Sequence, residues 1–113
     1  MCDKPTLETI TKKVCAAAKE VLGDKLEKVV LFGSYARGDY HEWSDIDIMV
    51  LSDIAPEDAD ETWREIRSVT GDLDLEHNII VSLHMVCSII YREWGNVLPF
   101  YKDVQKDGIE LYA

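Results

Sequence analysis

Apolar residues recur along the chain at two different spacings, and the spacing separates helices from strands. In some segments they return every three or four residues, which is typical of an amphipathic helix. In others they form short continuous runs, which favour buried strands. The predicted helices cover residues 6–22, 56–76, 88–94 and 99–106, and the predicted strands cover 26–32, 46–51, 79–87 and 109–112.

This alternation of strands and helices predicts one mixed fold. A chain of 113 residues has the size of a single domain, which we expect to cover residues 1–113. Helices that follow strands pack back onto the sheet, so the order predicts an α+β domain with α/β-like segments. The expected architecture is a small mixed β-sheet flanked by helices.

Charge narrows the expected partners. Asp and Glu number 22 against 12 Lys and Arg, so the net charge is −10. Nucleic-acid binding depends on neutralising phosphates with basic residues, so we expect no nucleic-acid partner. No apolar stretch reaches 18 residues and none lies at the N-terminus, so we expect neither a membrane span nor a signal peptide. Three widely spaced cysteines, Cys2, Cys15 and Cys87, favour reduced thiols and a cytoplasmic location.

Two aspartates open the second predicted strand. Side chains alternate along a strand, so Asp45 and Asp47 share one face while Ile46 and Ile48 turn to the core. Two carboxylates this close repel each other unless a cation lies between them, and Mg²⁺ prefers such oxygen ligands. The alternative is that Asp45 caps a turn and Asp47 lies exposed at a strand edge.

A glycine and a serine end the first predicted strand. Gly33 lets a phosphate approach the backbone, and Ser34 adds a hydroxyl at the start of a helical turn, where amide groups bind anions. Arg37 lies one turn further on and is a candidate phosphate ligand. The alternatives are an ordinary turn at Gly33 and a salt bridge from Arg37 to Asp39 or Glu42.

Residues 32–50, which read FGSYARGDYHEWSDIDIMV, resemble the GS-x(10)-DxD signature of the DNA polymerase β-like nucleotidyltransferase superfamily. The Ala-Arg-Gly and Ser-Asp-Ile-Asp segments are similar to its minimal nucleotidyltransferase (MNT) branch. The resemblance implies a polymerase β palm-like fold and transfer of a nucleoside monophosphate, AMP from ATP or from another NTP, to a hydroxyl. It also implies Mg²⁺ as cofactor.

The resemblance assigns roles by matching motif positions. Gly33 and Ser34 hold the triphosphate, with Arg37 and Ser44 as further nucleotide-binding positions, and Asp45 and Asp47 are the catalytic metal ligands.

This sequence differs from the family pattern at the third carboxylate. That carboxylate normally lies on the next core strand, here residues 79–87, which contain no Asp or Glu. The polar positions of this strand are Ser82 and His84. Either Glu76, just upstream, reaches the metal, or the third carboxylate is absent and the chain binds nucleotide with weak catalysis or none.

The same resemblance implies protein partners. MNT proteins often act as the antitoxin of a toxin–antitoxin pair beside a HEPN-type partner. A domain this small also implies a homodimer or a heteromeric partner to complete its substrate site. The alternative function is that of a catalytically degenerate MNT domain that binds nucleotide or partner.

Overall fold

A four-stranded mixed sheet forms the centre of the computed structural model, which describes residues 3–112. The strands are β1 (Leu26–Phe32), β2 (Ile46–Ser52), β3 (Val81–Cys87) and β4 (Ile109–Tyr112). Their order across the sheet is β3-β2-β1-β4. β1 runs antiparallel to both β2 and β4, whereas β3 runs parallel to β2.

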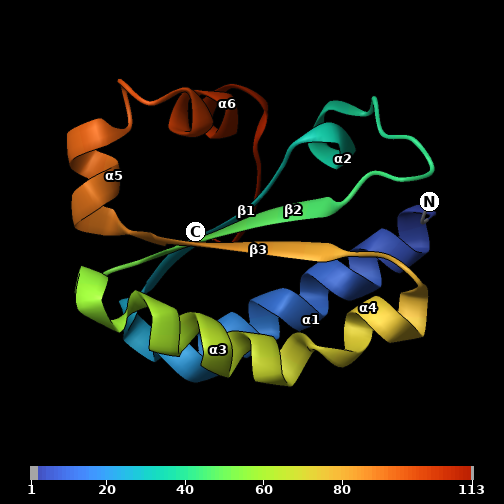
Figure 1. Cartoon of the computed structure of the whole chain (residues 1–113), viewed down its shortest axis with the longest axis horizontal. Coiled ribbons are helices and arrows are strands. Elements are labelled where there is room, and N and C mark those ends of the chain that lie inside the picture. The colour runs from blue at the N-terminus through green and yellow to red at the C-terminus, as the bar shows by residue number, and fades with distance from the viewer. Residues whose placement is uncertain (1–2, 113) are drawn as a thin grey trace.

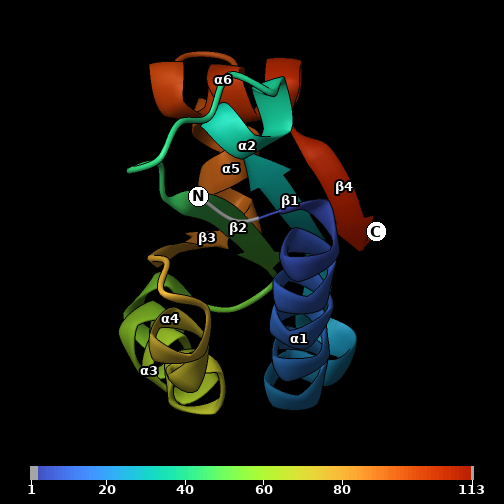
Figure 2. The same cartoon turned by 90° about the vertical axis from the view of Figure 1, so that its right-hand side faces the viewer.

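Helices cover both faces of this sheet (Figure 1). On one face lie α1 (Lys4–Leu22), α3 (Ala59–Thr70) and α4 (Asp72–His77). On the other lie α2 (Ser34–Arg37), α5 (Ser88–Trp94) and α6 (Pro99–Asp107). Figure 2 shows the same two layers along the sheet, with α1 and α3 side by side under it. Single 3₁₀ turns at Gly23–Lys25 and Pro56–Asp58 complete the helical segments. The predicted fold class is confirmed.

Each face of the sheet has its own hydrophobic cluster. The larger cluster lies under the sheet, where Ile46, Ile48 and Val50 of β2 pack with residues of α1 and α3. The smaller one lies above it, where Met49 and Leu51 pack with Val104 of α6. β2 is therefore buried on both faces for most of its length, and its polar side chains are confined to its ends.

Most predicted boundaries hold to within two residues. α1 begins at Lys4 because the Asp3 carboxylate accepts a hydrogen bond from the Thr6 amide at 2.9 Å, and it ends at Leu22, with Gly23 as its C-cap. β3 begins at Val81 rather than residue 79.

One predicted helix is wrong. Residues 56–76 do not form a single helix, because α3 ends at Thr70 and α4 starts after Gly71. The side chain of Asp74 in α4 pairs with Arg67 of α3 and accepts from the Val81 amide, so tertiary bonds draw α4 toward β3.

Within residues 3–112, no helix has both the length and the apolar character needed to cross a bilayer. Cys15 and Cys87 are free thiols, and Cys2 lies outside the described residues.

Candidate functional site

The bend after β1 and the second aspartate of β2 lie against each other. Phe32 and Asp47 are direct partners in the antiparallel β1–β2 pair, so Gly33 follows beside the carboxylate. Gly33 has φ of 76°, and a Cβ at this position would collide with Asp47 Oδ2. Glycine is therefore required here both by the backbone angle and by the approach of the carboxylate.

Ser34 opens the short helix α2 directly after this bend. The amides of Ala36 and Arg37 both donate to the Gly33 carbonyl at 3.1 Å, which closes the turn. Ser34 is the first residue of α2, so its hydroxyl and its backbone amide lie at the start of the helix, directly after the bend that contacts Asp47.

Asp45 lies one residue before β2, and its side chain is exposed. The strand starts where the Ile46 amide donates to the Ile80 carbonyl at 2.9 Å. The preceding turn is closed by Ser44, whose Oγ accepts from the His41 amide at 2.9 Å and whose amide donates to the His41 carbonyl at 3.0 Å. Ser44 thus orders the turn that leads into Asp45.

An aromatic stack ties this turn to α2. The rings of Tyr35 in α2 and Tyr40 in the loop are nearly parallel, at 8°, with centroids 4.4 Å apart. The stack joins the Gly-Ser half of the site to the Asp half. The sequence carried no signal for it, because a spacing of five residues does not by itself bring two rings together.

Arg37 and Glu76 are both engaged elsewhere. Arg37 Nε lies 3.1 Å from Asp39 Oδ2, the ion pair that the sequence left as an alternative, and this hydrogen bond raises the pKa of Arg37. Glu76 of α4 lies toward Lys13 of α1, with Oε2 3.8 Å from Nζ, and not toward Asp47, which is on the other face of the sheet. Among residues 3–112, no group of three His, Cys, Asp or Glu side chains is arranged to hold a metal ion.

β3 presents Ser82 and His84 to the same face as Asp47. The register pairs Asp47 with Ser82 and Met49 with His84. His84 Nε2 lies 3.6 Å from Asp47 Oδ1 and 3.2 Å from Ser82 Oγ. The imidazole is also held between the rings of Phe32 and Phe100, with centroids 5.1 and 5.4 Å away. At the strand where the family has its third carboxylate, this chain has an imidazole and a hydroxyl.

Comparison with known proteins decides the family. A model described as "Nucleotidyltransferase domain" matches residues 9–111. The chain belongs to the nucleotidyltransferase domain family. Two relatives of this nucleotidyltransferase from Methanocaldococcus jannaschii carry the name putative protein adenylyltransferase. One is 35% identical over 91 residues, covering 80% of this chain and 84% of the relative. The other is 30% identical over 105 residues, covering 93% and 97%.

Solved structures share the fold of this nucleotidyltransferase. A structure described as a putative minimal nucleotidyltransferase has a TM-score of 0.57 at 21% identity and covers 97% of each chain. A crystal structure of a toxin–antitoxin with AMP-PNP has a TM-score of 0.55 at 22% identity, covering 91% of this chain and 73% of that one. The predicted family and enzyme class are confirmed.

Proposed function

We propose that this nucleotidyltransferase transfers a nucleoside monophosphate, AMP from ATP, to a hydroxyl of a protein or small molecule in a Mg²⁺-dependent reaction. The single observation that carries the proposal is the contact between the Gly33 bend and Asp47. It puts the Gly33-Ser34 bend beside a carboxylate that shares the GS-x(10)-DxD signature with Asp45. The names of the relatives support adenylyl transfer in particular.

The residues present fit a magnesium ion. Mg²⁺ in proteins is usually held by one or two carboxylates, with water and substrate phosphates completing its shell. Asp47 is available for this role beside Gly33, and Asp45 is the second candidate at the strand entrance. When bound, the ion neutralises phosphate charge and orients the triphosphate.

Ser34 and Arg37 are the proposed triphosphate ligands of the chain. The Ser34 end of α2 offers its hydroxyl and a helix-start amide beside Asp47. Arg37 is more than a third exposed and needs only to exchange the Asp39 carboxylate for a phosphate oxygen. Ser44 contributes through the turn that it closes with His41.

In the proposed transfer, the acceptor oxygen forms a bond to the α-phosphorus while the bond from that phosphorus to the bridging oxygen breaks. Pyrophosphate leaves with the electron pair, and the hydroxyl proton passes to solvent. Such in-line displacements depend on charge neutralisation and positioning more than on covalent catalysis.

The proposed partners are an NTP and a protein, either of HEPN type or a second copy of the chain. A toxin–antitoxin structure with AMP-PNP among the fold neighbours supports a nucleotide and a protein partner of the toxin–antitoxin kind. The net charge of −10 supports a partner other than nucleic acid. We retain the cytoplasm as the predicted location.

The test is label transfer from ATP labelled at the α-phosphate, with the co-encoded proteins as acceptors, in Mg²⁺ and in EDTA. We expect Mg²⁺-dependent transfer that Asp45→Asn and Asp47→Asn abolish. Asp24→Asn is the matched control, because this exposed acid lies in the 3₁₀ turn before β1. No transfer to any acceptor would contradict the proposal.

The second candidate function, a nucleotide- or partner-binding domain without turnover, is favoured by one observation: β3 carries Ser82 and His84 where a carboxylate is expected. Calorimetry and label transfer together distinguish the two functions. Metal-dependent ATP binding without transfer identifies the binding domain.

A further inference from the structure

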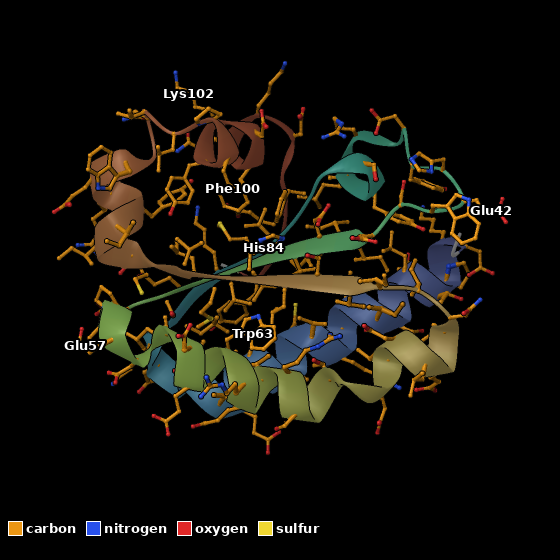
Figure 3. All side chains as sticks on the ribbon, viewed as in Figure 1. Glu42, Glu57, Trp63, His84, Phe100 and Lys102 are labelled. Atoms are coloured by element: carbon orange, nitrogen blue, oxygen red, sulfur yellow. The ribbon has the colours of Figure 1, made fainter. Side chains whose placement is uncertain are left out.

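A groove runs along the free edge of β3. It has a volume of about 520 Å³ and lies between α3 and α6. Trp63 and Asp60 of α3 form one wall, and Phe100 and Tyr101 of α6 form the other. Figure 3 shows Trp63 on one side of β3 and Phe100 on the other, with His84 between them. The volume is within the usual range of binding sites.

The outward backbone groups of β3 differ along this edge in whether they are hydrogen-bonded. The Ile80 carbonyl accepts from Ile46 of β2, so even-numbered residues face β2 and odd-numbered residues face outward. The outward carbonyls of Val81 and Leu83 are occupied, because Arg67 donates to the first at 3.2 Å and Trp63 Nε1 to the second at 2.8 Å.

Met85 is the next outward-facing residue, and it lines the groove. Among residues 3–112, the side-chain hydrogen bonds at this edge of β3 reach Val81 and Leu83 and none reaches Met85. A donor and an acceptor presented side by side on a strand edge match the backbone of another extended chain.

The position of the groove fits the approach of an acceptor, an argument that rests on the proposed function. The bend at Gly33 follows β1, Asp47 is on β2 and His84 is on β3, so the three follow the order of the sheet. The attacking and leaving oxygens of phosphoryl transfer lie roughly in line. With the triphosphate over the β1 end, the acceptor enters from the β3 side, where His84 lines the groove and lies 3.6 Å from Asp47.

The charge around the groove is negative. Asp60 lies in its wall, and Glu57 and Asp58 precede it at the start of the same helical segment. The charges of Glu57 and Asp58 reach the end of β3, because burial raises the pKa of the Cys87 thiol and these two charges add to the rise. An occupant of this groove gains from positive charge.

We propose that the groove binds an extended, basic segment of the acceptor polypeptide, which pairs with Met85 as a short added strand. Trp63 and Tyr101 pack against its side chains from either side, and Asp60 pairs with a lysine or arginine. β3 thereby delivers the acceptor to Asp47.

The test uses a synthetic peptide of alternating lysine and valine, which has no hydroxyl and so measures docking apart from transfer. We expect saturable binding in calorimetry and a shift of the Met85 amide resonance. The matched control is the same peptide with its central amides N-methylated, which keeps the charge but cannot pair as a strand. We expect it to bind at least tenfold more weakly, since tenfold is the loss of about 1.4 kcal/mol of backbone hydrogen bonding.

Protein variants complete the test. Asp60→Asn, at an exposed position, is expected to weaken peptide binding several-fold. Trp94→Ala, on α5 and outside the groove, is the control that leaves binding unchanged.

Equal binding of the N-methylated peptide, or no saturable binding at all, overturns the proposal. So does a chain that dimerises through this edge and is dissociated by the peptide, because the occupant is then a second copy. Label transfer with failed docking removes this inference alone. Docking with failed transfer removes the proposed function and the role of the groove as an acceptor site, and leaves the groove as a peptide-binding surface.

Discussion

The two faces of β2 differ in what their side chains do. Toward α1 and α3, Ile46, Ile48 and Val50 form a continuous apolar row within the larger cluster. Toward α6, Met49 and Leu51 are apolar, but Asp47 interrupts the row at the end that meets Gly33. One face of the strand therefore packs in the larger hydrophobic core. The other face carries the Asp47 carboxylate, whose position is fixed by the packing of the strand.

The comparison predicts that stability and activity separate by face. Ile48→Ala on the apolar face should lower the free energy of unfolding by about 2–5 kcal/mol, because it leaves a cavity in a fully buried position. Urea unfolding measures the loss, and Ile48→Val, at about 0.5–1.5 kcal/mol, is the graded control. Metal-dependent ATP binding by the folded fraction should be unchanged. An Asp47→Asn protein as unstable as Ile48→Ala would break the comparison.

Gly33→Ala should affect both properties, because Gly33 lies where the two roles meet. A side chain at positive φ costs about 1–2 kcal/mol, and here the new Cβ also displaces Asp47. Gly38→Ala is the matched control, since its φ is 85° but nothing lies within 4 Å of the added Cβ. Both variants should lose stability in thermal unfolding, and only Gly33→Ala should lose Mg²⁺–ATP binding in calorimetry. Equal binding by the two would show that the contact with Asp47 is irrelevant.

Tyr40→Ala tests the link between the two halves of the site. Losing the stack on Tyr35 should cost about 0.5–1.5 kcal/mol and loosen the loop that carries Asp45. Titration with Mn²⁺ as a spectroscopic probe should show weaker metal binding, and Tyr40→Phe should restore it by keeping the ring. If Tyr40→Ala binds metal as tightly as the native chain, the stack does not position Asp45.

The smallest expected effect is the pH dependence that Cys15 of α1, in the layer below the sheet, adds to the stability of the fold. Burial raises the pKa of the Cys15 thiol on α1. The fold thus favours the neutral thiol, and this contribution to stability is present below the ordinary thiol pKa and lost as pH rises through the raised one. Alkylation of Cys15, followed by peptide mass spectrometry, should be slow at neutral pH and accelerate in urea. Equal rates with and without urea would mean that α1 does not shield it.

Sequence patterns predicted the four strands, because runs of apolar residues are a local signal. The family resemblance implied that Gly33, Ser34 and the aspartates share one site, and the antiparallel pairing of β1 with β2 places Gly33 beside Asp47. The break at Gly71 could not be predicted in the same way. Gly71 has helical backbone angles, so it does not itself mark the break. The position of α4 depends on the bonds of Asp74 to Arg67 and to the Val81 amide, which the sequence does not reveal.

The sequence marked Ser82 and His84 as polar positions of the third strand but did not fix which side chains they contact. That His84 faces Asp47 depends on the register between β2 and β3, and that Glu76 faces Lys13 depends on the layer in which α4 lies. Neither contact can be predicted from the residue types alone.

The pairing of Phe32 with Asp47 has a consequence for protein engineering. The distance between the bend and the carboxylate is set by two neighbouring strands and not by the residues that connect them. Foreign sequence grafted after Gly38, with Tyr40 and the His41–Ser44 turn retained, should leave that distance intact, which makes this loop a place for reporter peptides or altered acceptor preference.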